Sequence, residues 1–339
     1  DSPEYVLTVD ISSSDTVADL ETLYSGKVVL WQPADGFAVL GLDHAPSNLS
    51  ALATSSLETN QAKFWSNAKQ AWMSGGVSAW SGGGVSAWSG GSYRPLPQNT
   101  TKWLNMNLQQ AQLLATNLGA GIKVAVIDSG VDLAHPALAG GFVPAIEMWD
   151  YVGNDAVPQE EGTLGTGAYG HGTSVAAIVL QFAPKAKILP LRVLSPNGSG
   201  DVLHVAAAIT KAVSKGVKIS NLSLGSDVRS AAVASAIAAA TAKGVYIVSS
   251  SGNTANTSIT YPANDAALTT TAGLYSVSVG SVNALDKKSS FSTYGTSLEI
   301  VGQGDDPQID VLGHEQLQDL VRPFLACLVA VENENNPVG

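Results

Sequence analysis

A chain of 339 residues with 45% hydrophobic residues is long enough to bury a sizeable core, which excludes general disorder. Its formal net charge of −11 excludes the basic surface that nucleic acid or an anionic membrane requires. No apolar run reaches the ~18 residues of a membrane span, and the single cysteine, Cys327, excludes an intramolecular disulfide. We therefore expect neither a nucleic-acid partner nor a membrane partner.

The first sixty residues have the pattern of a small module of strands and helices. Alternating apolar residues predict three strands, over 5–10, 28–31 and 37–42. An amphipathic pattern predicts a helix over 15–24, and a second helix is expected over 47–57. We therefore expect a compact α+β domain over residues 1–60.

Residues 61–102 are rich in Gly, Ser and Trp. The octapeptide Gly-Gly-Val-Ser-Ala-Trp-Ser-Gly occurs twice, from Gly75 and from Gly83. So much glycine disfavours regular structure and predicts a flexible linker. The alternative is a surface that presents three tryptophans to a partner: Trp72, Trp80 and Trp88.

From residue 103 onward, buried strands alternate with helices. Continuous apolar runs predict strands over 123–128, 186–193, 217–222 and 245–249. Helices are predicted over 108–117, 203–214 and 231–242. This alternation is typical of a parallel sheet that helices cover on both faces. We therefore expect a second domain of the α/β class over residues 103–304.

Three polar residues of this second domain stand in short, specific motifs. Asp128 ends an apolar strand in Asp128-Ser-Gly, His171 stands in Gly170-His-Gly-Thr, and Asn253 stands in Ser251-Gly-Asn. Each alone has a structural interpretation, as a turn carboxylate, a structural histidine or a turn amide. Open α/β sheets hold their sites at the carboxyl edge, so we expect the three side chains to converge there.

Taken together, these motifs resemble those of the subtilisin-like serine peptidase (subtilase) family. Three further segments share the resemblance: Asn221-Leu-Ser-Leu-Gly225, Tyr261-Pro-Ala263 and Ser290-Phe-Ser-Thr-Tyr-Gly295. The resemblance implies an α/β fold with a subtilisin-like doubly wound, mostly parallel sheet and helices on both faces. It also implies that the first domain is a ferredoxin-like α+β inhibitory propeptide.

The same resemblance implies roles for individual residues. Asp128 would orient His171, and His171 would be the general base. Asn253 would donate a hydrogen bond to the oxyanion. The edge segment that pairs with an extended substrate would be Ser223, Leu224 and Gly225.

The nucleophile segment departs from the family pattern. The family's Gly-Thr-Ser-Met-Ala is expected near residue 318, where Gly313-His-Glu-Gln-Leu stands, and no Ser or Thr follows Ser297. Ser297 fits a strand entering the sheet, and Cys327 fits a buried apolar residue. No nucleophile is therefore assigned. The atypical tail over 305–339 is consistent with a truncation, a reading-frame change or a divergent replacement.

Two functions follow from this pattern. The first is a secreted subtilisin-like serine endopeptidase precursor that hydrolyses peptide bonds by family but is inactive in this chain, because the nucleophile is missing. The alternative is a non-catalytic pseudopeptidase that binds peptides or its own propeptide. Secretion is suggested by the low charged fraction of 13%, and a start at Asp1 without Met or an export signal suggests a processed or engineered chain.

No cofactor, metal site or oligomeric state is assigned from the sequence. Four loop carboxylates are available for calcium, on Asp132, Asp150, Asp155 and Asp201. Isolated aspartates of this kind are usually turn formers. The run Gly165-Thr-Gly-Ala-Tyr-Gly170 spells a dinucleotide fingerprint but does not follow a strand, so nucleotide binding is not expected.

Overall fold

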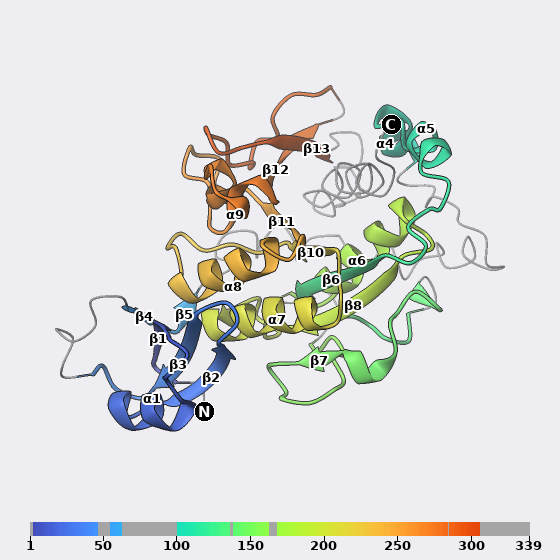
Figure 1. The fold of residues 1–339 in the computed structure, drawn as a ribbon. Coiled ribbons are helices and arrows are strands. Elements are labelled where there is room, and N and C mark those ends of the chain that lie inside the picture. Colours follow the sequence, from blue (N-terminus) through green and yellow to red (C-terminus); the bar gives the residue numbers. More distant parts are fainter. Residues whose placement is uncertain are drawn as a thin grey trace, which may run out of the picture.

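The computed structural model describes residues 3–46, 55–62, 100–135, 138–162, 168–283 and 285–305 of the chain. In these residues a small N-terminal module lies beside a larger α/β domain (Figure 1). No helix in the described ranges combines the length and apolar character that a membrane crossing needs. The repeat with Trp72, Trp80 and Trp88 lies outside the described residues, as does most of the predicted linker.

The N-terminal module is an antiparallel four-stranded sheet with one described helix. Its elements are β1 (Tyr5–Asp10), α1 (Val17–Tyr24), β2 (Lys27–Gln32), β3 (Phe37–Leu42) and β4 (Ser55–Thr59). The strand order is β2-β3-β1-β4, so β1 pairs with both β3 and β4. Thr16 is the N-cap of α1, and its hydroxyl accepts a hydrogen bond from the backbone N–H of Asp19. The three predicted strands and the first predicted helix are confirmed.

The second predicted helix, over 47–57, is wrong where the structure describes it. Residues 55–57 belong to strand β4, and residues 47–54 lie outside the described residues. Leu57 pairs with Leu7 of β1 and packs against the apolar cluster under α1. Pairing with β1 therefore overrides the local helical pattern, as tertiary context often does.

The larger domain is built on a seven-stranded sheet in which all neighbouring strands are parallel. Its strands are β6 (Lys123–Asp128), β7 (Trp149–Asp150), β8 (Lys187–Arg192), β10 (Ile219–Leu222), β11 (Tyr246–Ser250), β12 (Ser276–Asn283) and β13 (Ile300–Asp305). The order is β13-β12-β11-β10-β6-β8-β7. The chain thus leaves β6 in both directions, which confirms the doubly wound arrangement.

Helices cover both faces of this sheet. On one face lies α6 (His171–Phe182), with α4 (Thr100–Asn105) and α5 (Leu108–Leu114) near its end. On the other face lie α7 (Val202–Ser214) and α8 (Ala231–Thr241), and the short α9 (Thr271–Leu274) packs against α8. In β6, Val124 and Val126 point to the α6 face, whereas Ala125 and Ile127 point to the α7 face. A strand buried on both sides must be apolar throughout, which explains the continuous run.

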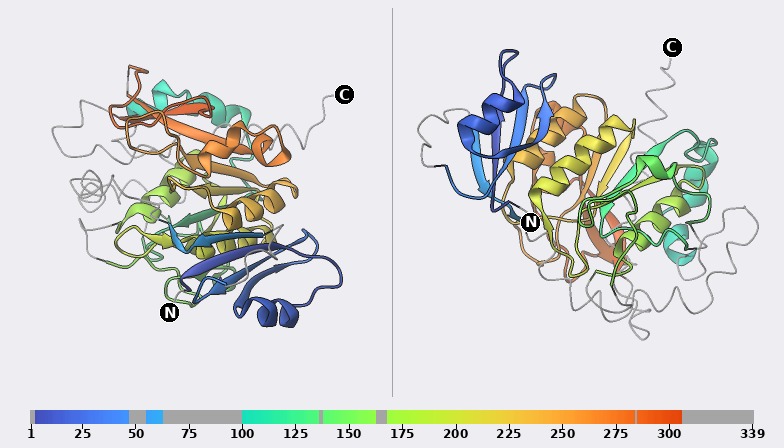
Figure 2. Two further views of the ribbon diagram at one scale, coloured as in Figure 1. Left: turned by 90° about the vertical axis from the view of Figure 1, so that its left-hand side faces the viewer. Right: turned by 90° about the horizontal axis from the view of Figure 1, so that it is seen from below.

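The N-terminal module docks on the outer side of α7 and α8 (Figure 2). Four of its apolar residues belong to the same buried cluster as these helices: Val6, Leu30, Phe37 and Val39. The short strand β5 (Gln61–Ala62) pairs antiparallel with β9 (Gly200–Asp201), which directly precedes α7. The two domains therefore share one apolar core and one strand pairing.

Two polar side chains of the module also reach the starts of these helices. The carboxylate of Glu58 accepts hydrogen bonds from the Ser230 hydroxyl at 3.0 Å and the Ala232 N–H at 3.1 Å, at the start of α8. Asn60 Oδ1 accepts a bond of 3.4 Å from the Leu203 N–H at the start of α7. The first N–H groups of a helix have no partner within it, so the module satisfies donors that α7 and α8 leave open.

Replacing Glu58 by Ala should weaken this docking. The Glu58→Ala variant loses the acceptor at the start of α8. Its free energy of unfolding, measured for the first transition in urea, should therefore be lower than that of the wild type by about 1 kcal/mol. Asp43→Ala, which removes an exposed carboxylate of the same module, is the matched control and should not change it. Equal losses in the two variants would contradict a specific role of Glu58.

Candidate active site

The carboxylate of Asp128 lies buried at the carboxyl end of β6. Asp128 is 0% exposed, and its Oδ1 accepts a hydrogen bond of 2.7 Å from the backbone N–H of Ser129. Its backbone carbonyl accepts hydrogen bonds from the N–H groups of Val193 at 2.8 Å and Leu194 at 3.2 Å, just after β8. The end of β6 is thus tied to the neighbouring strand, and the carboxylate has a fixed position.

The imidazole of His171 contacts this carboxylate directly. His171 is the first residue of α6, and its Nδ1 lies 2.6 Å from Asp128 Oδ1, with both side chains almost fully buried. The start of α6 can come this close only because residue 172 is glycine. A Cβ on Gly172 would lie 2.0 Å from the carbonyl oxygen of Gly130. Two residues that the sequence analysis expected to meet at the sheet edge are therefore in contact.

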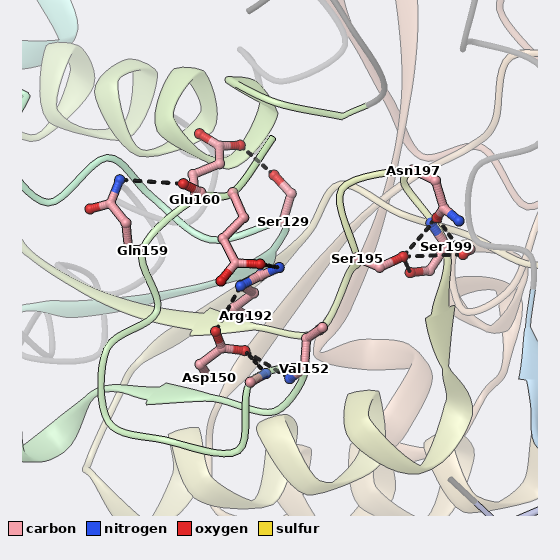
Figure 3. A network of polar contacts seen from close by, with 11 residues as sticks. Ser129, Asp150, Val152, Gln159, Glu160, Arg192, Ser195, Asn197 and Ser199 are labelled. Atoms are coloured by element: carbon pink, nitrogen blue, oxygen red, sulfur yellow. Dashed lines mark hydrogen bonds and ion pairs between the residues drawn. The ribbon is translucent and has the colours of Figure 1, made fainter. Parts of the chain in front are cut away.

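A second buried carboxylate, that of Glu160, joins the end of β6 to the start of α6. Its Oε1 accepts a hydrogen bond of 2.6 Å from the Ser129 hydroxyl (Figure 3), and its Oε2 accepts one from the Thr173 hydroxyl. Each hydroxyl oxygen also accepts a bond from a backbone N–H: Gly172 at 3.1 Å to Ser129 and Asp132 at 2.8 Å to Thr173. Both hydroxyl hydrogens are therefore available only to Glu160.

Opposing influences set the charge of Glu160. Burial is the largest, and with the nearby charge of Asp128 it raises the pKa of Glu160 from 4.5 to about 7. The two hydroxyl donors and the charge of His171 act in the opposite direction, because they favour the carboxylate. Glu160 therefore changes charge near neutral pH, beside the Asp128–His171 pair.

The loop that carries Glu160 is held on both sides. The N–H of Val131 donates to the Pro158 carbonyl at 2.9 Å, and the N–H of Glu160 donates to the Val131 carbonyl at 3.2 Å. The fully buried guanidinium of Arg192 binds the loop at two further points (Figure 3), donating to Asp150 at 2.8 Å and to Glu161 at 2.9 Å. Glu160 thus belongs to a fixed part of the structure.

No local sequence pattern marks Glu160 as a functional residue. It stands in Pro158-Gln-Glu-Glu, where nothing distinguishes it from its neighbour Glu161. The structure separates them, because Glu160 is 4% exposed whereas the side chain of Glu161 is 61% exposed. The sequence could have pointed to such a bridge only through the two hydroxyl partners of Glu160. Ser129 directly follows Asp128, and Thr173 stands two residues after His171.

The other expected site residues follow the two strands next to β6. Ser223, Leu224 and Gly225 come directly after β10, and Asn253 comes shortly after β11. Because β6, β10 and β11 are adjacent and parallel, these residues lie at the same edge of the sheet as Asp128.

The segment Ser223–Gly225 is held in place without being part of a strand. The amide of Asn221 donates to the Ser223 hydroxyl at 2.8 Å, and Leu224 is 0% exposed. Within the described ranges the segment takes part in no strand pairing. A Cβ on Gly225 would lie 2.4 Å from Thr260 Oγ1, so this backbone lies tightly against the segment before Tyr261.

The structure places Ser297 away from His171. The Ser297 hydroxyl donates to Asn264 Oδ1 at 2.6 Å, and its carbonyl accepts a bond from Ser278 of β12. In the strand order, β12 lies three positions from β6, which corresponds to roughly 14 Å at the usual strand spacing. Cys327 and the segment near residue 318 lie outside the described residues.

The loop aspartates considered for calcium act mainly as turn acceptors. Three of them bind the backbone N–H two residues on: Asp132 binds Ala134 at 3.1 Å, Asp150 binds Val152 at 2.7 Å and Asp155 binds Val157 at 2.7 Å. Asp201 lies 3.6 Å from His204 Nδ1. In the part of the chain that the structure describes, no group of three or more His, Cys, Asp or Glu could hold a metal ion.

Comparison with known proteins gives a consistent result. Residues 119–329 match the model of the Subtilase family, peptidase S8. The chain is 39% identical over 195 residues to thermitase of Thermoactinomyces vulgaris, covering 55% of this chain and 64% of thermitase. It is 32% identical over 231 residues to the thermophilic serine proteinase of Bacillus sp. (strain AK1), covering 65% of this chain and 55% of that protein. The chain thus spans less than two thirds of the length of either relative.

A solved structure supports the same likeness. The crystal structure of a cold-adapted subtilisin-like serine proteinase matches with a TM-score of 0.51 at 28% sequence identity. The match covers 64% of this chain and 77% of that protein.

The raised pKa of Glu160 predicts a pH dependence of stability. Because the folded protein binds this proton more tightly than the unfolded chain, the contribution is fully present below pH 4.5 and is lost as pH rises through about 7. A shift of this size corresponds to up to about 3 kcal/mol. Urea unfolding across this range should show the loss in the wild type but not in Glu160→Gln, with Asp43→Asn, at an exposed position of the N-terminal module, as control. Equal pH slopes in the wild type and Glu160→Gln would contradict the assignment.

Proposed function

Because the chain belongs to the subtilase family, we propose that it is a secreted serine endopeptidase precursor of the subtilisin type that does not itself turn over peptides. The observation that carries the proposal is the 2.6 Å contact between His171 Nδ1 and Asp128 Oδ1. The composition, with a charged fraction of 13%, supports secretion. Polypeptides are the substrate class of such a peptidase.

In this proposal Asp128 and His171 form the proton-transfer pair. With Nδ1 donating to Asp128, the other ring nitrogen, Nε2, takes the proton of a nucleophile and returns it to the leaving amine. Asp128 fixes this tautomer and stabilises the imidazolium that forms. Its burial strengthens that effect, because charges interact more strongly away from water.

Two further segments at the same sheet edge serve substrate binding in the proposal. The amide of Asn253 donates to the oxyanion, and removal of one such donor raises a barrier by roughly 3 kcal/mol. The segment Ser223–Gly225 offers its backbone to an extended peptide. Its position after β10, outside any strand pairing in the described residues, supports this role.

The N-terminal module acts as an inhibitory propeptide in this proposal. Its sheet is docked on α7 and α8, and β5 leads away from it along β9. We assign residues 1–60 to this module, 61–102 to a linker, 103–304 to the catalytic domain and 305–339 to an atypical tail. The linker would deliver the carboxyl end of the module toward the substrate-binding edge.

Absence of turnover is proposed from the sequence after Ser297. Residues 298–339 contain no Ser or Thr, so no hydroxyl nucleophile stands in this part of the chain. Without the nucleophile, an oxyanion site and substrate binding retain at most a rate effect of roughly 10³- to 10⁴-fold.

A serine-directed fluorophosphonate tests the absence of a nucleophile. The probe should leave the protein unlabelled in intact-mass measurements, because labelling needs a hydroxyl activated by His171. His171→Ala is the control for background reaction. Stoichiometric labelling of the wild type that disappears in His171→Ala would show an active nucleophile and overturn this part of the proposal.

The missing serine also favours a second function, that of a pseudopeptidase that holds peptides without cutting them. The substrate-binding edge described above does not depend on a nucleophile, so binding would persist when hydrolysis does not. The occupants would be extended peptides or the chain's own propeptide segment.

Peptide binding distinguishes this second function. Extended hexapeptides should bind in calorimetry and be recovered uncut. Gly225→Ala should weaken binding at least about 10-fold, because the new Cβ would displace the edge segment from Thr260. Asp43→Ala should bind as the wild type does. A lack of affinity for every extended peptide would exclude the pseudopeptidase.

A further inference from the structure

We propose that Glu160 is a positioning residue for the Asp128–His171 pair, holding the end of β6 and the start of α6 at a fixed separation through its two carboxyl oxygens. The inference rests on the proposed function in treating the pair as the proton-transfer machinery. It adds a residue that belongs to neither motif and is linked to both through Ser129 and Thr173.

The Asp128–His171 contact joins two separate elements, so something must fix their relative position. Glu160 does so with one oxygen on Ser129, the residue after Asp128, and one on Thr173, two residues after His171. The Gly172 N–H adds a direct link of 3.1 Å to the Ser129 hydroxyl. A shift of α6 relative to β6 would therefore break buried hydrogen bonds as well as the contact with His171.

The pattern of donors and acceptors fits an ionised carboxylate at position 160, the form that Glu160 takes above a pH of about 7. Both hydroxyl oxygens already accept a backbone N–H, and each hydroxyl has one hydrogen to give. The residue between them must accept at both of its ends. A glutamine accepts at one end only and would direct its NH₂ group at an occupied hydroxyl, and an aspartate is one methylene too short to reach both partners.

The support of Glu160 is rigid, as a positioning residue requires. Gln159 and Val131 form a parallel bridge, which places Glu160 beside the segment that follows Asp128. Arg192 anchors the same loop through Asp150 and Glu161. Because the loop is bound at both of its sides, Glu160 cannot follow a displaced helix.

Glu160 also acts on the pair through its charge. The groups that interact electrostatically with it are Asp128, His171 and Tyr169. Ionised Glu160 favours the imidazolium form of His171, and neutral Glu160 does not. The protonation of His171 should thus depend on Glu160, which a purely structural buried residue would not cause.

The test is an NMR titration of His171 in the full chain. In Glu160→Gln, the pKa of His171 should fall by roughly 0.5 unit or more, and the low-field resonance of its Nδ1 proton should broaden as the contact with Asp128 loosens. Asp43→Asn removes the same charge at an exposed position of the N-terminal module, where solvent screens it, and should leave both readouts unchanged.

The outcomes separate a positioning role from a structural one. If Glu160→Gln lowers the melting temperature but leaves the His171 pKa and the Nδ1 resonance as in the wild type, the proposal is overturned. If Glu160→Gln does not fold, Thr173→Val removes one arm of the bridge and Thr173→Ser keeps it. The Nδ1 resonance should then broaden in Thr173→Val alone, and identical spectra would overturn the proposal.

These readouts are independent of peptide hydrolysis. A fluorophosphonate that labels the chain would contradict the proposed lack of turnover and leave the role of Glu160 intact. An unchanged His171 titration in Glu160→Gln would remove that role and leave the assignment of the pair intact.

Discussion

The short contact between the imidazole of His171 and the carboxylate of Asp128 sets the strictest requirement on this structure. It places two polar groups where water cannot screen or replace them, so a small displacement would leave a buried charge without its partner. The pair comes from a strand end and a helix start that are 43 residues apart. The glycine at 172, the bridge through Glu160 and the anchoring of its loop by Arg192 all keep these two elements in register.

The sheet supplies the frame for this contact. Parallel strands buried on both faces bring their carboxyl ends to one edge, and the residues after β6, β10 and β11 lie at that edge for this reason. Segments that are far apart in the sequence can thus lie at the same edge of the sheet. The N-terminal module is attached to the opposite side of α7 and α8, so it contributes to the core and caps helices without belonging to the sheet.

The sequence predicted the parts of the fold whose patterns are local. Apolar runs placed β1, β3 and β6 within their observed bounds, and the motifs around Asp128 and His171 indicated the contact between them. Strand β12 was missed, because its alternation of Ser and Val suggests an exposed strand, whereas Ser278 and Ser281 are buried and hydrogen-bonded. Glu160 was missed because its partners lie 31 and 13 residues away, and no local pattern encodes such a bridge.

Helix α7 carries apolar residues around most of its circumference, including Leu203, Val205, Ala206 and Ile209. One side of such a helix packs against the sheet, and the apolar residues on its other side must be buried by a further layer. In this chain the cover is the N-terminal module, through Val6, Leu30, Phe37 and Val39. If that layer were removed, the remaining domain would expose an apolar face of α7 to solvent. In concentrated solution the domain would then self-associate, unless another molecule covered that face.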